Sequence, residues 1–327
     1  MLVDGEWDPN GTLEHDDGGN FVRQPTSFRN RVSLDPDETH PVDAGRYHLY
    51  VSYACPWAHR TLIGRALLDL ESHISVDVVD PIRHDDGWEF DASVPDSTPD
   101  TVCGSSYLRE VYLEADPAYT GRVTVPILWD RDAHTIVNNE SIDILEQLDT
   151  VFGEHFDAPI TLFPTDRYAE IKQTIDDNYT SINNGVYRAG FAASQAAYDA
   201  AIDELFEALE HWDGILADQR YLLGEVFTAA DICLFTTLLR FDPVYHVHFK
   251  CSRKKIEEYP HLHAYVSDLA QHPAIAKTIN LEHIRKHYYI SHNSLNPRGF
   301  IAAMPANHLV DTHDRDELPG RFARRDP

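Results

Sequence analysis

Positive charge is scarce in this chain of 327 residues, which has 27 lysines and arginines against 54 aspartates and glutamates, a formal net charge of −27. Lysine is rarest, with only Lys172, Lys250, Lys254, Lys255, Lys277 and Lys286. Such a surface repels the phosphates of nucleic acids and anionic membranes, so we expect neither as a partner. Abundant acid with little lysine indicates a halophilic protein, because concentrated salt screens self-repulsion. An ordinary acidic protein is the alternative.

Long apolar runs are also absent: no stretch approaches the roughly 18 residues that a membrane-spanning helix needs. The N-terminus lacks the basic start and apolar middle of a signal peptide. Four cysteines in so long a chain make no disulfide scaffold, so we expect a reducing, cytoplasmic location. At roughly 150 residues per domain, the length predicts two domains, each large enough for its own core.

The first half of the chain predicts an arm followed by a β/α unit. Residues 1–44 show no sustained hydrophobic periodicity, which favours an extended arm. The expected elements of the unit are strands at 46–52 and 74–80 around a helix at 56–70, then strands at 123–129 and 135–137 and a helix from 139. Pro126 interrupts the strand at 123–129, and we expect it at a strand start, edge or bulge. The first three elements predict a parallel strand pair joined by a crossover helix. We place this domain at residues 45–155, with a long polar stretch at 81–121 inside it.

The second half is predicted to be all-helical, at residues 160–300. Helical periods run over residues 166–183, 195–216, 228–241 and 256–271. Thr228 and Asp231 predict a capping box at the start of the third helix. In such a box the Thr228 side chain accepts the backbone N–H of residue 231, and the Asp231 side chain accepts the backbone N–H of Thr228. Residues 301–327 are polar and contain proline, so we expect a surface tail that begins at about Met304.

A cysteine stands where the first strand gives way to the first helix, in SYACPWAHR at residues 52–60. Pro56 suits the first helical position, where a missing N–H is no loss, so Cys55 faces the unpaired amides and positive end of the helix. Such cysteines titrate at roughly 3.5 to 7.5 against about 8.5 when free, and the thiolate is the nucleophile. An inert buried thiol is the alternative. Ala58 stands where a dithiol redox motif would have its second cysteine. An external thiol must therefore resolve any mixed disulfide on Cys55.

The other cysteines and the histidines carry weaker signals. Cys233 and Cys251 are expected to be structural, whereas Cys103, in the polar stretch, stays open as a redox partner. No C-x-x-C pair is present, and the spacing of the histidines and cysteine between residues 246 and 292 matches no familiar zinc finger. We therefore expect no metal.

Six blocks of sequence carry a resemblance to a known family. They are YVSYACPWAHRTL (50–62), RVTVPILW (122–129), NNES (138–141), NGVYRAGF (184–191), RFDPVY with HFKC (240–251) and HYYISH (287–292). In these blocks the chain resembles the glutathione transferase fold, an α/β thioredoxin-like N-terminal domain followed by an all-α C-terminal domain. Within that fold it is similar to the glutathionyl-hydroquinone reductases of the Xi class.

The resemblance implies a site for a γ-glutamyl thiol beside a nucleophilic Cys55. Its residues are Trp88, Arg122, Val123, Thr124, Val125, Glu140 and Ser141. Val125, before a cis proline, offers backbone groups to the peptide, Glu140 can pair with the α-amino group, and Ser141 at a helix start can take the α-carboxylate. Arg122 offers a fork for a second carboxylate. Alternatively, Glu140 and Ser141 only start a helix and Trp88 is a packing aromatic.

The resemblance also matches Tyr187, Tyr245 and Tyr288 to catalytic tyrosines near the hydroquinone. When Cys55 takes the sulfur of a conjugate, the ring carbon must gain a proton, which a tyrosine hydroxyl can supply. We assign Tyr187 as the donor and Tyr245 and Tyr288 as stabilisers, with Tyr289 able to exchange roles with Tyr288. A buried tyrosine bonded to backbone is the alternative for each.

The sequence thus predicts a thiol-dependent reductase that frees hydroquinones from their thiol conjugates. Its co-substrate would be glutathione or γ-glutamylcysteine, with no permanently bound cofactor, and the family resemblance implies a homodimer. A general thiol transferase or dehydroascorbate reductase would use the same cysteine. A non-catalytic protein that binds aromatic ligands would not need it.

Overall fold

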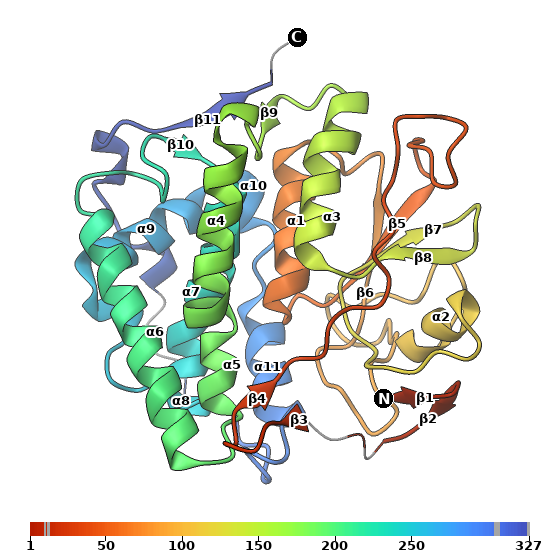
Figure 1. Cartoon of the computed structure of the whole chain (residues 1–327), viewed down its shortest axis with the longest axis horizontal. Helices are drawn as coiled ribbons and strands as arrows, with labels where there is room; N and C mark the ends of the chain where they lie inside the picture. The colour runs from red at the N-terminus through yellow and green to blue at the C-terminus, as the bar shows by residue number, and fades with distance from the viewer. Residues whose placement is uncertain (10, 12–13, 304–307, 326–327) are drawn as a thin grey trace. The chain divides into compact units, whose positions relative to one another are not determined.

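The computed structural model describes residues 1–9, 11, 14–303 and 308–325, which form two compact units (Figure 1). Unit 1 comprises Met1–Thr12, Gln24–Pro159 and Asn280–Gly299. Unit 2 comprises Leu13–Arg23, Ile160–Ile279 and Phe300–Pro327. Met304, where the predicted surface tail begins, lies outside the described residues.

Unit 1 is built on a four-stranded sheet of order β6-β5-β7-β8. Its strands are β5 (Tyr47–Val51), β6 (Ser75–Val78), β7 (Ile127–Asp130) and β8 (Thr135–Asn138). β5 and β6 are parallel and are joined through helix α1 (Pro56–Leu67), which confirms the predicted crossover. β7 begins at Ile127 rather than at the predicted residue 123, because Pro126 has no N–H to donate to the ladder.

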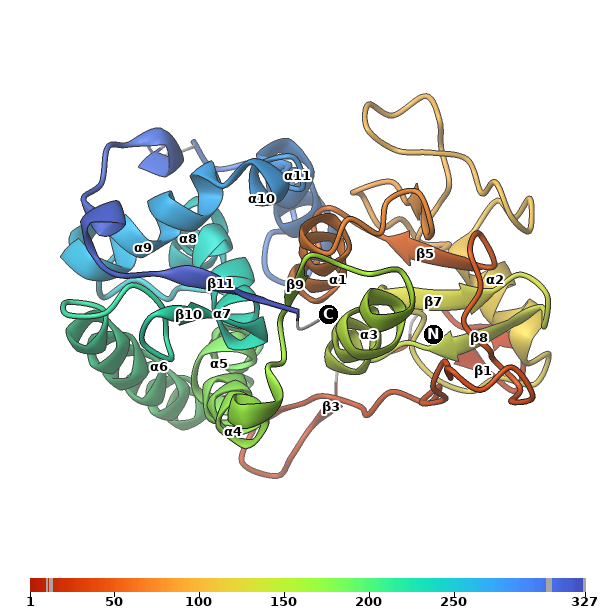
Figure 2. The same ribbon diagram turned by 90° about the horizontal axis from the view of Figure 1, so that it is seen from above.

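Helices cover both faces of this sheet. α1 and α3 (Ser141–Gln147) lie on one face, and α2 (Leu108–Ala115) lies on the other (Figures 1 and 2). The sequence did not predict α2, because only Leu108, Val111 and Tyr112 give it a buried stripe within a polar stretch. A capping box on Glu110, whose carboxylate accepts the Tyr107 N–H at 3.1 Å, defines its start.

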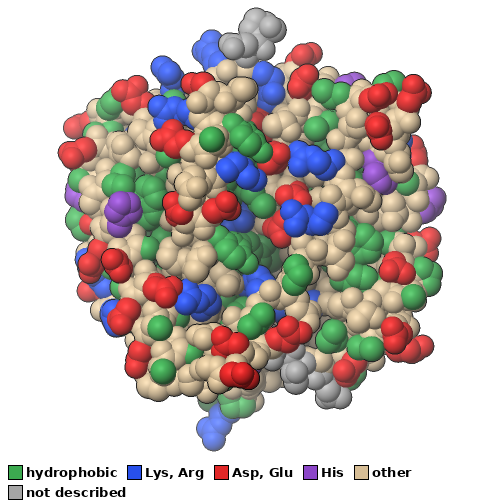
Figure 3. Space-filling model, in the orientation of Figure 1, with side chains coloured by type: hydrophobic (Ala, Val, Ile, Leu, Met, Phe, Trp, Pro, Cys, Tyr) green, Lys and Arg blue, Asp and Glu red, His purple; other side chains and the backbone are tan. Residues whose placement is uncertain are grey.

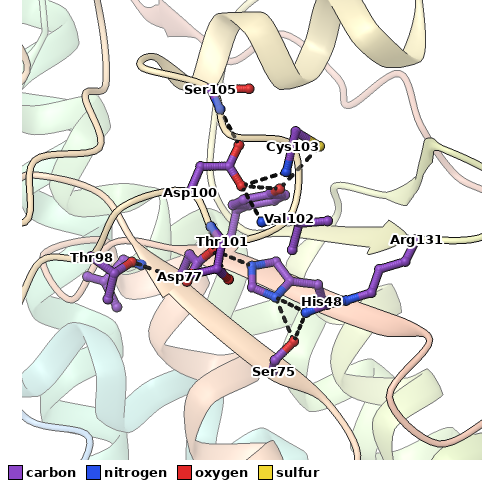
Figure 4. Close-up of polar contacts among 12 residues, drawn as sticks. His48, Ser75, Asp77, Thr98, Asp100, Thr101, Val102, Cys103, Ser105 and Arg131 are labelled. Atoms are coloured by element: carbon purple, nitrogen blue, oxygen red, sulfur yellow. Dashed lines mark hydrogen bonds and ion pairs between the residues drawn. The ribbon is translucent and has the colours of Figure 1, made fainter.

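Buried carboxylates attach the polar stretch to the sheet (Figure 4). The Asp77 carboxylate accepts from the Thr101 amide and hydroxyl at 2.7 and 2.8 Å, and His48 Nε2 lies 3.2 Å from it. Although burial alone would raise it, these bonds hold the pKa of Asp77 below its usual value. Asp100 accepts the N–H groups of Val102, Cys103 and Ser105. Side-chain acceptors rather than apolar periodicity therefore order this stretch.

The arm predicted at residues 1–44 contains two short antiparallel pairs rather than extended chain alone. One joins β1 (Leu2–Val3) to β2 (Glu6–Trp7), and the other joins β3 (Glu14–His15) to β4 (Phe21–Val22). Strands of two residues are too short to leave a period in the sequence.

Unit 2 is mainly helical. Its helices are α4 (Tyr168–Asn178), α5 (Gly185–Gly190), α6 (Gln195–Ile215), α7 (Ala229–Arg240), α8 (His246–His248), α9 (Pro260–Gln271) and α10 (Pro273–Ala276). π-Helical turns at Tyr179–Asn183 and Phe241–Tyr245 extend α4 and α7. The capping box of α7 is confirmed, since the Thr228 N–H donates to Asp231 Oδ2 at 2.9 Å.

Unit 2 also holds a small sheet of order β10-β11-β9 that the sequence did not predict. Its strands are β9 (Ile160–Thr161), β10 (Val226–Phe227) and β11 (Arg321–Arg324). β11 comes from the segment expected to be a surface tail, and it pairs with both other strands.

Helix α11 (Leu281–Ser291) groups by its contacts with unit 1, although its sequence position is in the predicted all-helical region. Its histidines contact backbone carbonyls of the polar stretch: His283 Nε2 lies 2.7 Å from Pro95 O, and His287 Nδ1 lies 2.8 Å from Pro81 O. Because these contacts join segments that are distant in the sequence, the sequence alone does not predict that the helix belongs to unit 1.

Candidate active site

Cys55 is the N-cap of α1. The chain leaves β5, turns with the Cys55 N–H donating to Ser52 O at 3.1 Å, and enters the helix with Pro56 at its first position. The half-buried Cys55 Sγ accepts the N–H of Ala58 at 3.5 Å. The local geometry predicted from the sequence is therefore confirmed: the sulfur faces the free amides at the positive end of a helix.

The segment before β7 lies against this sulfur. The Val125–Pro126 peptide bond is cis, and the Cys55 thiol donates to Val125 O at 3.5 Å. The preceding Thr124 is held by Tyr112 of α2, whose hydroxyl donates to Thr124 O at 2.9 Å and accepts the Thr124 N–H at 3.2 Å. Tyr112 was not among the residues predicted for the site, because the polar composition of residues 81–121 gave no sign of helix α2.

Glu140 and Ser141 lie at the start of α3. The Ser141 hydroxyl donates to Glu140 Oε1 at 3.4 Å, and the Thr26 hydroxyl donates to Glu140 Oε2 at 3.3 Å. Arg60 of α1 donates to Ser141 Oγ at 3.4 Å. A carboxylate, a hydroxyl and a guanidinium therefore converge at the helix end where the family resemblance implies the γ-glutamyl group.

For the other residues predicted to bind the thiol, the structure shows packing and backbone contacts rather than a contact with Cys55. Trp88 is buried and stacks on His287 of α11, with ring centroids 4.8 Å apart and 17° between the planes, so it is at least a packing aromatic. Val123 is buried as well. Arg122 is half-buried, and its carbonyl accepts the Tyr119 hydroxyl at 3.2 Å.

The three predicted tyrosines divide between the units. Tyr187 and Tyr245 of unit 2 have ring centroids 6.0 Å apart, and each lies 5.3 Å from the ring of Phe249. The Arg23 guanidinium lies 4.9 Å over the Tyr187 ring. Tyr288 belongs to α11 in unit 1, where its ring meets His287 edge-on at 5.3 Å.

Comparisons with known proteins decide the family. Residues 54–151 match the glutathione S-transferase N-terminal domain, and residues 195–267 match the C-terminal domain. The chain is 46% identical to the glutathionyl-hydroquinone reductase YqjG of Escherichia coli, over 97% of this chain and 98% of that protein. An Xi-class glutathione transferase from Natrialba magadii is 51% identical over 98% of each chain, with a TM-score of 0.92. The glutathione-bound structure of YqjG covers 96% of this chain and 98% of its own at 45% identity, with a TM-score of 0.88.

This chain belongs to the Xi class of glutathione transferases. The predicted fold is thereby confirmed, with an α/β thioredoxin-like domain first and a helical domain second.

The remaining cysteines of this glutathione transferase differ from Cys55. Cys233 and Cys251 are buried, and burial raises the pKa of the Cys251 thiol. Cys103 is exposed, yet the Tyr50 hydroxyl lies 3.5 Å from its sulfur. Partial desolvation raises the pKa of Cys103, and the nearby Asp100 carboxylate adds to that rise. These environments favour the thiol rather than the thiolate.

Tyr289, which the sequence could not separate from Tyr288, is buried in the same helix. Burial raises the pKa of Tyr289 to about 12, which makes it a weak proton donor. Within the described residues of this transferase, no group of three or more His, Cys, Asp or Glu side chains is placed to hold a metal ion. None of the helices in the described residues combines the length and the hydrophobicity that a membrane-spanning segment requires.

Proposed function

We propose that this chain is a thiol-dependent reductase that removes glutathione or γ-glutamylcysteine from S-conjugated hydroquinones. The observation that carries the proposal is the position of Cys55, whose sulfur accepts the Ala58 amide at the N-terminus of α1 beside the cis peptide bond at Val125. Hydrogen bonding and the helix dipole both favour a thiolate there. The name of the related YqjG protein supplies the substrate class, and its glutathione-bound structure supplies the thiol.

In the first step the Cys55 thiolate attacks the sulfur of the conjugate. A disulfide forms between Cys55 and the γ-glutamyl thiol while the bond between that sulfur and the ring carbon breaks. The electron pair stays on the ring carbon, which takes a proton from the Tyr187 hydroxyl, and solvent returns a proton to Tyr187. The released product is the free hydroquinone.

In the second step another thiol molecule restores the enzyme. Its thiolate attacks the ligand sulfur of the mixed disulfide, so Cys55 leaves as a thiolate and the two thiol molecules leave as a symmetrical disulfide. The ring carbon is reduced, and the sulfur of the conjugate and the sulfur of the one incoming thiol are oxidised to the disulfide. The reaction therefore requires no permanently bound cofactor. Ala58 at the second motif position is consistent with this external resolution.

The γ-glutamyl group supplies most of the recognition in this proposal. Glu140 pairs with its α-amino group and Ser141 with its α-carboxylate, while the backbone of Val125 binds the cysteinyl unit. Either thiol has these groups. The fully buried Tyr245 acts on the reaction through Tyr187, whose ring it neighbours.

A turnover assay on a glutathionyl-hydroquinone, with glutathione and γ-glutamylcysteine as separate reductants, tests the proposal. Wild type should release hydroquinone and Cys55→Ser should not, whereas Cys103→Ser, the matched exposed cysteine, should keep full activity. Reduction of mixed disulfides or dehydroascorbate without cleavage of the conjugate would favour general thiol transfer. Binding of the aromatic ligand without any turnover would favour a binding protein. Homodimer formation and a cytoplasmic location stay predictions.

A further inference from the structure

Arg60 carries a buried charge without a matching carboxylate. The residue is 2% exposed, and its guanidinium lies 4.5 Å over the ring of Trp57. It donates to Ser141 Oγ at 3.4 Å, a long bond, and its Nε has no hydrogen-bond partner. None of the ion pairs formed among the described residues includes Arg60.

This arrangement differs from that of another buried arginine in the chain. Arg315 is also 2% exposed and its Nε likewise has no hydrogen-bond partner, but its two terminal nitrogens donate to the carbonyls of Leu216, Gln219 and Arg220 at 2.8, 2.6 and 2.6 Å. Burying a charge is costly unless it is paired or well hydrogen-bonded. Arg315 meets that requirement through backbone acceptors, whereas Arg60 has one hydroxyl and an aromatic face. An anion beside Ser141 would complete the partners of Arg60.

We propose that Arg60 is a positioning residue for the α-carboxylate of the γ-glutamyl thiol, acting through Ser141. Because Arg60 donates to a lone pair of Ser141 Oγ, the hydroxyl hydrogen must point to a different acceptor. In the structure that acceptor is Glu140 Oε1 at 3.4 Å. When the thiol binds, the hydroxyl turns to the carboxylate and Glu140 turns to the α-amino group. Arg60 then balances the carboxylate as Glu140 balances the ammonium. This inference rests on the proposed function.

The proposal separates the two charges of the ligand, so ligand analogues can test it. S-methylglutathione is the reference ligand, because its blocked sulfur cannot react with Cys55. One analogue has γ-aminobutyrate in place of γ-glutamate and so lacks only the α-carboxylate. The other has glutarate there and lacks only the α-amino group. Calorimetry gives the dissociation constant of each ligand for wild type and for Arg60→Met, Glu140→Gln and Arg65→Met.

Arg60→Met should weaken binding of S-methylglutathione about tenfold or more but leave the analogue without the carboxylate almost unaffected. Glu140→Gln should show the converse pattern, with its loss confined to ligands that keep the amino group. Arg65→Met is the matched control on α1: Arg65 donates to Ile74 O at 2.6 Å and should not change any of the three constants.

A purely structural role for Arg60 predicts different results. It would weaken all three ligands equally or none, and either pattern overturns the inference. If Arg60→Met does not fold, Arg60→Lys keeps the charge and decides by the same comparison, with a smaller loss confined to ligands that keep the carboxylate. In thermal melts the unliganded Arg60→Met protein should stay close to wild type while its stabilisation by S-methylglutathione falls. If wild type binds neither S-methylglutathione nor S-methyl-γ-glutamylcysteine, the proposed function fails, and the inference with it. If it binds only the second ligand, the same comparison is made with analogues of γ-glutamylcysteine.

Discussion

The thiol side of unit 1 and the tyrosine cluster of unit 2 are built in different ways. In unit 1 the proposed chemistry depends on backbone features: the free amides at the start of α1, the cis bond before Pro126 and the start of α3. In unit 2 it depends on side-chain packing, with Tyr187 and Tyr245 around Phe249. Backbone features leave a local mark in the sequence, whereas an aromatic cluster does not. The two regions should therefore respond differently to substitution.

The largest expected effect is in unit 1. Cys55→Ser should lower turnover of a glutathionyl-hydroquinone by at least about 10³-fold, because the serine hydroxyl is not ionised at neutral pH. Steady-state release of the hydroquinone measures this loss. Cys103→Ser is the control, and a comparable loss there would show that the assignment of the nucleophile is wrong.

Tyr187→Phe tests the role of the aromatic cluster in unit 2. It should lower kcat for cleavage of the carbon–sulfur bond by about 10²-fold, because the ring carbon loses its proton donor. Reduction of a small mixed disulfide needs no carbon protonation and should stay within about twofold of wild type. Equal losses on both substrates would place Tyr187 in packing rather than in proton transfer.

A smaller effect concerns the stability of unit 2. Burial raises the pKa of Asp231 from 3.8 to about 6, above its value in the unfolded chain. The folded state therefore holds a proton that the unfolded state has lost, so the free energy of unfolding falls as pH rises from about 4 to 6. Relative to Asp231→Asn, wild type should lose about 2–3 kcal/mol over this window. Urea unfolding at several pH values measures the difference, and parallel pH profiles would contradict it.

The smallest expected effect concerns the acidic surface of the protein and the dependence of its melting temperature on salt. Acidic side chains are spread across the face shown in Figure 3. Because salt screens their repulsion, raising KCl from about 0.1 to about 2 M should raise the melting temperature by several degrees. Sucrose at equal osmolality is the control for preferential exclusion. Equal melting temperatures at both salt concentrations would contradict adaptation to salt.

Much of the thiol side could be predicted from the sequence. Cys55 and Pro56 mark the start of α1, and Thr228 with Asp231 marks the start of α7. Both helix starts could be predicted because each depends only on residues that are neighbours in the sequence. The order of strand, helix and strand then determines the parallel pair of β5 and β6. The roles assigned to the tyrosines came only from resemblance to a family.

The remainder depends on contacts between distant segments. The Tyr112 hydroxyl donates to Thr124 O from helix α2, which lies in the polar stretch and was not predicted. Trp88 stacks on His287, which lies about two hundred residues further along the chain. Neither contact has a period or spacing that a single sequence displays. The strand β11 is a further example, since four residues near the end of the chain pair with two segments far from them in sequence.

The proposed mechanism depends on a Cys55 thiol that ionises readily at neutral pH, and this ionisation can be measured. The rate of alkylation by iodoacetamide is followed against pH in a Cys103→Ser background, where Cys55 is the remaining cysteine that is not buried. If Cys55 is the thiolate nucleophile, labelling is fast at neutral pH, with an apparent pKa below about 7.5. Slow labelling with an apparent pKa at or above about 8.5, that of an ordinary thiol, would contradict it.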